Sequence, residues 1–145
     1  MTRAMFAQVL LNLDGGSPSF TTSSFDDVST TAWYFAAVEW AAQQGVVLGV
    51  GEGTFDPGRP ITREQMAVML YRFVNAMEIE LPQVETAAFT DQASISVWAV
   101  DAVRAIQAAG IIVGRPDGSF DPQTTATRAE VATIFARFLD LIDTE

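Results

Sequence analysis

The chain of 145 residues is 49% hydrophobic, enough to fill the core of one compact domain, and its net charge is −10 at neutral pH. This charge disfavours binding to nucleic acid or to an acidic membrane surface, and no apolar run reaches the roughly 20 residues of a membrane span. The chain has no histidine and no cysteine, which removes the commonest general base, thiolate nucleophiles and zinc–thiolate sites. We therefore expect a protein that is not an enzyme and that uses no cofactor or metal.

All the basic residues of the chain are arginines. A guanidinium group is a planar fork that can grip a carboxylate or a phosphate through two parallel hydrogen bonds. Any anion site in this acidic chain is therefore expected to be local and built from arginine.

The chain opens with a partial copy of a later segment, because residues 2–10 match residues 62–70, with threonine and arginine at the first two positions of both. We interpret residues 1–14 as the trailing half of a first repeat that lacks its leading half. The opening residues Thr2-Arg3-Ala4-Met5 have no acidic fourth residue, so the capping box of this helix is expected to be broken. Residues 15–24, rich in Gly and Ser, are expected to form a linker.

Residues 25–75 predict two helices around a glycine-rich loop. Apolar residues recur at helical spacing from Trp33 to Ala41, before Gly45, which suits a left-handed cap. Residues 46–48 are too few for a helix and predict a short buried strand or turn, followed by a loop at 49–57. Thr62 and Gln65 can form a capping box, so the second helix is expected to begin there. Residues 76–88 are expected to be a second linker.

Residues 89–142 are expected to form another full repeat. When this segment is aligned with residues 25–75 so that Trp98 falls on Trp33, the two segments match at many positions. The same alignment places residues 55–57 (Phe-Asp-Pro) on residues 120–122, and Thr127 and Glu130 again spell a capping box. Such repetition predicts stacked helical units, none of which can bury its apolar face alone.

The ordered motifs of these repeats resemble the S-layer homology (SLH) family. The resemblance rests on residues 25–28, 33, 45–47, 53–57 and 61–64, and on residues 89–91, 98, 110–114, 118–122 and 127–130. The last of these, Thr127-Arg128-Ala129-Glu130, is the signature for which the family is known. The resemblance implies a mostly α fold, with one module over residues 1–145 whose repeats form a pseudo-threefold helical bundle with grooves between them.

The resemblance also implies a function at the bacterial cell surface, in the cell wall or S-layer. Family members hold proteins there noncovalently by binding acidic, often pyruvylated, wall polysaccharide, and some bind modified peptidoglycan instead. The signature arginine contacts the acid group of the ligand. The ligand-binding candidates are Arg63, Arg128, Arg3, Trp33, Trp98, Asp27, Asp91, Gly49 and Gly114.

Each candidate also has a structural interpretation. Arg63 and Arg128 follow helix caps, where free amides favour an anion, but they could instead pair with acids such as Asp56 and Asp121 and only fix a loop. Each of the remaining candidates likewise has a binding interpretation and a structural one. Trp33 and Trp98 could stack on sugars or pack in the core, as Trp40 is expected to do; Asp27 and Asp91 could cap a turn or accept sugar hydroxyls; Gly49 and Gly114 could supply positive backbone angles or let a ligand approach.

The alternative function is self-assembly or binding to another protein, with purely structural repeats. An incomplete first repeat would expose Phe6, Val9 and Leu10, and a homo-oligomer could complete it. The anchoring hypothesis, by contrast, predicts that Arg128→Ala or Arg63→Ala weakens binding to wall polymer and leaves thermal unfolding nearly unchanged.

Overall fold

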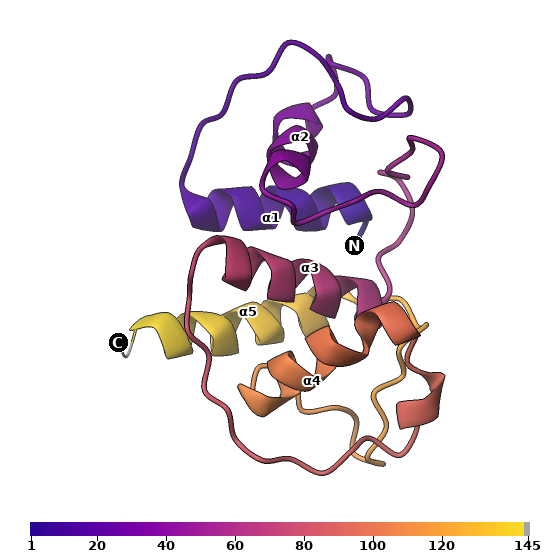
Figure 1. Ribbon diagram of the computed structural model, residues 1–145, viewed down its shortest axis with the longest axis vertical. Coiled ribbons are helices and arrows are strands. Elements are labelled where there is room, and N and C mark those ends of the chain that lie inside the picture. Colours follow the sequence, from indigo (N-terminus) through magenta and orange to yellow (C-terminus); the bar gives the residue numbers. More distant parts are fainter. Residues whose placement is uncertain (144–145) are drawn as a thin grey trace. The chain divides into compact units, whose positions relative to one another are not determined.

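The computed structural model describes residues 1–143, which are mostly helical (Figure 1). The helices are α1 (Arg3–Asp14), α2 (Phe35–Gln43), α3 (Arg63–Ala76), α4 (Val100–Ala108) and α5 (Arg128–Asp143), with 3-10 turns η1 (Gln92–Ser94) and η2 (Val97–Ala99). Within the described residues the extended backbone forms only isolated bridges, such as the one between Thr62 and Thr125. The expected mostly α class is confirmed. Thr144 and Glu145, at the end of the predicted module, lie outside the described residues.

The chain divides into two compact units, Met1–Ile61 and Thr62–Glu145. The first unit holds α1 and the leading half of the predicted repeat 25–75. The second unit begins with the trailing helix of that repeat and also contains the predicted repeat 89–142. The boundary therefore falls inside the predicted repeat 25–75, just before its second helix. The single module, the repeat boundaries and the pseudo-threefold arrangement stay predictions.

In the first unit α1 packs against α2. The Oγ1 of Thr2 accepts a hydrogen bond from the backbone N–H of Met5 at 3.1 Å, so half of the capping box survives at this helix start. Phe6 and Leu10 are wholly buried and Val9 is half-buried. The expectation that Phe6 and Leu10 are exposed is wrong, because α1 is not left without a packing partner.

The leading helix of this unit begins at Phe35, two residues after Trp33. Trp40 is buried, as predicted. Glu39 is buried on the same helix, and its carboxylate accepts the backbone N–H and the hydroxyl of Ser24 at 2.8 and 2.6 Å. These bonds tie the end of the 15–24 segment to α2 and satisfy a charge that would be costly to bury alone.

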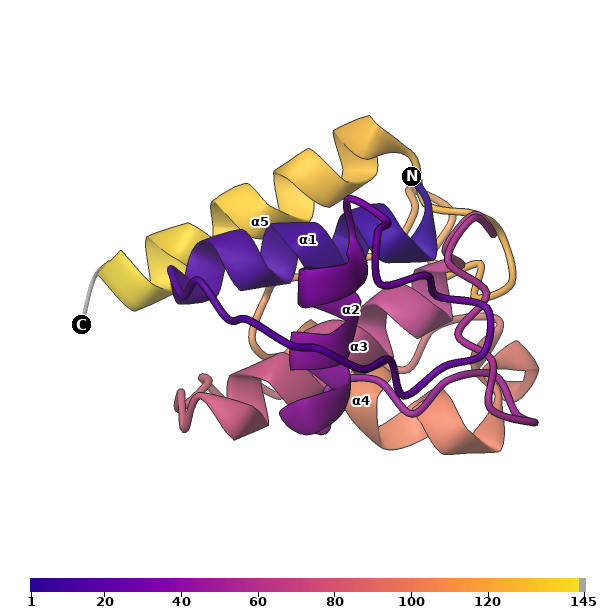
Figure 2. The same cartoon turned by 90° about the horizontal axis from the view of Figure 1, so that it is seen from above.

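In the second unit α3 packs against α4, and both views show these helices side by side (Figures 1 and 2). The capping box of α3 is complete: the N–H of Gln65 donates to Thr62 Oγ1, and the Gln65 side chain accepts from the Thr62 N–H. At the start of α5 the N–H of Glu130 donates to Thr127 Oγ1 at 3.1 Å. The predicted starts of both trailing helices are thus confirmed.

The segments after the leading helices, where a short strand or a turn was expected, form turns and no strand. Ile111 and Ile112 are buried, whereas Val113 is 61% exposed. The N–H of Ile111 bonds back to the carbonyl of Ile106 at 3.2 Å, which turns the chain at the end of α4. Val46, Val47 and Leu48 show the same pattern of burial in the first unit.

An arginine-lined pocket beside α5

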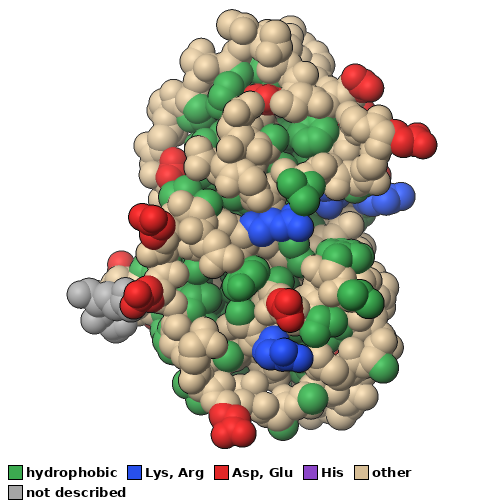
Figure 3. Space-filling view, viewed as in Figure 1, with side chains coloured by type: hydrophobic (Ala, Val, Ile, Leu, Met, Phe, Trp, Pro, Cys, Tyr) green, Lys and Arg blue, Asp and Glu red, His purple; other side chains and the backbone are tan. Residues whose placement is uncertain are grey.

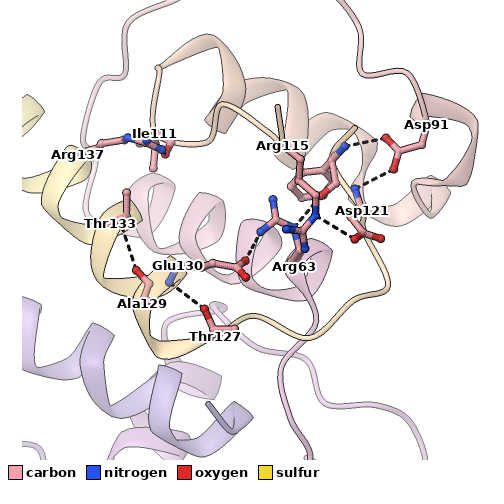
Figure 4. A network of polar contacts seen from close by, with 11 residues as sticks. Arg63, Asp91, Ile111, Arg115, Asp121, Thr127, Ala129, Glu130, Thr133 and Arg137 are labelled. Carbon is pink, nitrogen blue, oxygen red and sulfur yellow. Dashed lines mark hydrogen bonds and ion pairs between the residues drawn. The ribbon is translucent and has the colours of Figure 1, made fainter. Parts of the chain in front are cut away.

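Arg63, the first residue of α3, has its side chain buried in the interior of the second unit. It is only 6% exposed, and its Nε donates to the carbonyl oxygen of Phe120 at 2.7 Å. Its Nη1 pairs with the carboxylate of Glu130, and its guanidinium lies 5.3 Å from the centre of the Phe120 ring (Figure 4). The candidate arginine therefore joins the start of α3 to a loop and to α5.

Arg3 makes the equivalent contacts in the first unit. Its Nε donates to the Phe55 carbonyl oxygen at 2.9 Å, and its guanidinium lies 4.7 Å from the centre of the Phe55 ring. Burial lowers the pKa of Arg3, and the charge of Asp56 acts against that change. A guanidinium stays charged in spite of such a shift. Both buried arginines therefore hold the Phe-Asp-Pro loop of the repeat that follows.

The two acids named as possible partners of Arg63 and Arg128 pair with other arginines. Asp56 pairs with Arg59 and Asp121 pairs with Arg115, each at 3.0 Å. Asp121 is therefore not the partner of Arg63, which uses Glu130 in its place. The alternative interpretation was right that Arg63 meets an internal carboxylate but wrong about which one. Arg128 is exposed at the first residue of α5.

The acid that follows Arg63 is also used by the fold. Glu64 is buried, and its carboxylate accepts the backbone N–H and the hydroxyl of Ser96 at 2.9 and 2.7 Å. Ser96 directly precedes η2. The acidic residue next to the arginine therefore positions the start of the leading helix in the second unit.

Asp27 and Asp91 cap loops that lie far away in the sequence. The two carboxylate oxygens of Asp91 accept the backbone N–H groups of Phe120 and Asp121, both at 2.8 Å (Figure 4). Asp27 accepts the same pair of N–H groups, from Phe55 and Asp56, at 2.8 and 2.7 Å. These carboxylates hold a distant loop in place of the local cap that was expected, and Asp91 makes no side-chain cap bond at the start of η1. Contact with sugar hydroxyls stays a prediction.

Gly49 and Gly114 have the positive backbone angles that were expected, with φ of 82° and 83°. A Cβ atom on Gly114 would lie 2.6 Å from a ring carbon of Phe89, and one on Gly49 would lie 2.8 Å from a ring carbon of Phe25. Both glycines therefore let an aromatic ring approach the backbone. A role for either in ligand binding stays a prediction.

Trp33 and Trp98 lie on the surface, with exposed fractions of 63% and 57%. Trp33 meets the ring of Tyr34 edge to face, with ring centres 5.1 Å apart. Their exposure contradicts a core position and leaves sugar stacking as a prediction. Neither tryptophan lines the pocket described next.

A pocket of about 310 Å³ opens beside α5, and all the residues that line it belong to the second unit. It brings together two of the predicted site residues, Arg63 and Gly114, with two arginines that the sequence interpretation did not select. We call it the α5 pocket. Its lining residues are Arg63, Ile112, Val113, Gly114, Arg115, Pro116, Ala129, Glu130, Thr133, Ile134 and Arg137.

The α5 pocket is cationic although the chain is acidic. It contains three arginines and one acid, Glu130, whereas the whole chain has a net charge of −10. On the face shown in Figure 3, the few charged side chains are scattered among hydrophobic and neutral atoms. The pocket is therefore a local concentration of positive charge next to the apolar side chains of Ile112, Val113 and Ile134.

One signal for the missed arginines was present in the sequence. Ala129, Thr133 and Arg137 follow one another at intervals of four residues, which places them on one face of a helix. All three line the α5 pocket. Arg115 had no comparable signal, because its position depends on the conformation of a loop.

Other kinds of site find no support in the described part of the chain. Over residues 1–143 no cluster of three or more acidic side chains is arranged to bind a metal ion. None of the helices over these residues combines the length and the hydropathy needed to cross a bilayer.

Comparison with known proteins finds the S-layer homology domain at residues 24–67 and 88–132. The chain is 33% identical to an amylopullulanase of Thermoanaerobacterium thermosulfurigenes over 97% of its length, but it covers 8% of that protein. It is 31% identical to a cellulosome-anchoring protein of Acetivibrio thermocellus, over 97% of this chain and 32% of the relative. It is 28% identical to an S-layer protein of Bacillus thuringiensis subsp. finitimus, over 92% of this chain and 15% of the relative. The chain thus spans less than a third of each of these relatives.

Proposed function

Because the chain belongs to the S-layer homology domain family, whose members lie at the bacterial cell surface, we propose that it anchors a larger protein to the cell wall. The anchoring is noncovalent and uses an acidic wall polysaccharide, such as one carrying pyruvate ketals, as the ligand. The observation that carries this proposal is the α5 pocket, a cationic hollow in an acidic chain.

The α5 pocket combines the two kinds of surface that an acidic sugar needs. Guanidinium groups can form charge-assisted hydrogen bonds with a carboxylate, and the exposed apolar side chain of Val113 can cover the less polar face of a sugar ring. Val113 and Gly114 come directly after the buried residues Ile111 and Ile112, so this wall is held by the core of the unit. The ligand would therefore meet a surface that is formed before it binds.

Arg63 supports the α5 pocket from within. Its Nε and Nη1 are already used by Phe120 and Glu130, and it is almost wholly buried. Its main contributions are the positive charge at this end of the pocket and the attachment of the Phe-Asp-Pro loop. Arg3 performs the same attachment in the first unit.

The names of relatives agree with anchoring. A cellulosome-anchoring protein and an S-layer protein match this chain over more than nine tenths of its length, and the amylopullulanase is matched over only 8% of its own length. We propose that the chain itself is not catalytic. Glycoside hydrolysis by the usual route requires a pair of carboxyl groups, and the one acid that lines the α5 pocket, Glu130, is bound to Arg63.

Sedimentation with purified bacterial cell walls tests this function. The chain should sediment with native walls, less with walls whose ketal-linked pyruvate has been removed by mild acid, and not with peptidoglycan stripped of its polysaccharide. Equal sedimentation with native and stripped walls would identify peptidoglycan as the ligand. A chain that stays in solution with every wall preparation would refute the anchoring proposal.

The self-assembly alternative has lost the observation that motivated it. It required an exposed apolar face on α1, and Phe6 and Leu10 are buried. We therefore do not propose an oligomer that completes the first repeat.

A further inference from the structure

The three arginines of the α5 pocket differ in what neutralises them. Arg63 pairs with Glu130, and Arg115 pairs with Asp121 at 3.0 Å. Arg137 donates from Nη1 to a neutral group, the carbonyl oxygen of Ile111, at 3.3 Å. Among residues 1–143 no carboxylate lies within ion-pair distance of Arg137.

We propose that Arg137 receives the acidic group of the ligand in the α5 pocket and that Arg63, the arginine singled out by the sequence, does not. This inference rests on the proposed function and names the residue that gives the site its preference for an acidic sugar.

The position of Arg137 leaves its fork accessible. It is half-buried on α5, unlike Arg63, which is 6% exposed. The hydrogen bond from Arg137 to Ile111 uses one N–H of Nη1, and a guanidinium carries further N–H donors that can bind a carboxylate through two bonds. The anion can therefore be bound without breaking an existing ion pair.

Binding at Arg63 or at Arg115 would be less favourable. A ligand carboxylate at either residue would have to displace Glu130 or Asp121 or be placed beside it. At the buried Arg63, displacement leaves Glu130 without its partner, and at either arginine the nearby acid brings like charges together. Arg137 avoids both problems, because Figure 4 shows it beside Ile111 and apart from the pair formed by Arg63 and Glu130.

The neighbours of Arg137 suit the rest of a sugar. Thr133 lies one helical turn before Arg137, and its hydroxyl donates to the carbonyl oxygen of Ala129 at 3.0 Å (Figure 4). Its oxygen lone pairs can still accept a hydrogen bond from a sugar hydroxyl. Ile134 adds an apolar contact on the same side of α5. A carboxylate, a hydroxyl and an apolar ring face can thus be met by one short stretch of α5.

The experiment compares Arg137→Gln with Arg72→Gln. Arg72 is the counterpart of Arg137 on α3, it is also half-buried, and it does not line the α5 pocket. Affinity for polysaccharide released from native walls is measured by calorimetry, and the unfolding midpoint of each variant is measured in parallel. We expect Arg137→Gln to weaken binding by roughly 10- to 100-fold and Arg72→Gln to change it by less than about twofold.

Arg137→Lys separates binding from structure. Lysine keeps the charge but loses the planar fork, so binding should recover only in part and should stay sensitive to salt. The proposal is wrong if Arg137→Gln binds the polysaccharide as tightly as the natural chain does. It is also wrong if the weaker binding of Arg137→Gln is explained by a lower unfolding midpoint, so that less of the chain is folded.

Titration with a small acidic sugar distinguishes an error in the proposed role of Arg137 from an error in the proposed anchoring function. Glucuronic acid is titrated into the natural chain, with glucose as the neutral control, while the side-chain Nε–H signals of the arginines are followed by NMR. We expect the Arg137 signal to move with glucuronic acid and the Arg72 signal to stay. A shift at Arg137 in a chain that binds no wall preparation would support the site and refute anchoring, whereas a shift confined to other arginines would overturn the site.

Discussion

The Nε of Arg63 donates to the carbonyl oxygen of Phe120 at 2.7 Å, across 57 positions of the sequence. This bond joins the trailing helix of one repeat to the loop of the next. Arg3 and Phe55 are related in the same way in the first unit, at 2.9 Å. In both units, therefore, a hydrogen bond from an arginine joins consecutive repeats. Arg63, which the sequence suggested as a ligand-binding residue, has a structural role.

Arg63→Ala is expected to destabilise the second unit by about 2–4 kcal/mol, because it removes a buried charged hydrogen bond and leaves Glu130 without its partner. This differs from the sequence-based expectation that thermal unfolding would hardly change. Urea denaturation followed by circular dichroism measures the difference. Arg72→Ala, at the half-buried counterpart of Arg137 on the same helix, is the control and should cost much less. Equal stability of the two variants would show that the contacts of Arg63 contribute little.

Gly114→Ala should be more destabilising than Gly110→Ala. Both residues have positive φ, 83° and 77°, so both substitutions incur backbone strain of about 1–2 kcal/mol. A Cβ on Gly114 would also lie 2.6 Å from the Phe89 ring, whereas a Cβ on Gly110 would meet open space. We expect displacement of the ring to add about 1–3 kcal/mol, as overpacking does elsewhere. Thermal unfolding of the two variants gives the comparison, and a smaller loss for Gly114→Ala would contradict the packing of Phe89 on this glycine.

The ionised carboxylate of Glu39 should stabilise the fold at neutral pH, and this contribution should be lost at acidic pH. Burial pushes the pKa of Glu39 up, but hydrogen bonds from Ser24 and Gln43 outweigh burial, so the pKa lies below its ordinary value of 4.5. A depressed folded-state pKa contributes stability that is complete above the unfolded-state pKa and is lost as the pH falls through the folded-state pKa.

Denaturation at a series of pH values tests this prediction with Glu39→Gln. The variant should be less stable than the natural chain at neutral pH, and the gap should narrow as the pH falls below 4.5. Ser24→Ala should remove part of the same pH-dependent gap, because Ser24 donates its hydroxyl to the carboxylate at 2.6 Å. A gap that stays constant down to strongly acidic pH would mean that the charge of Glu39 does not stabilise the fold.

Local signals predicted the helices well. The capping residues Thr62 and Thr127 begin helices where expected, and Trp40 is buried. These predictions succeeded because a cap depends on neighbours three positions away and apolar periodicity depends on one face of one helix. For residues 46–48 the sequence left a strand and a turn open, and both this segment and its counterpart 111–113 form a turn, because a buried apolar pair can be satisfied in a turn that bonds back to the preceding helix.

Tertiary contacts decided which charged groups meet. The sequence contains Arg63, Asp121 and Glu130, but nothing local indicates that Arg63 pairs with Glu130 and that Arg115 takes Asp121. The same applies to Asp91, whose carboxylate caps N–H groups 29 and 30 positions later. Such pairings depend on how loops return to the helices, and the chain must close long loops before they form.

By itself, then, the amino-acid sequence determined the repeated pattern, the starts of the trailing helices, the positive backbone angles at glycine and the family, because each of these depends on short-range spacing or on a repeated pattern. Only the tertiary structure decided that Arg63 is turned inward, that Arg137 faces a pocket with no carboxylate partner among the described residues, and that Phe6 and Leu10 are covered. The physical reason is that burial and the neutralisation of a charge are properties of the surroundings of a side chain, and those surroundings come from distant parts of the chain.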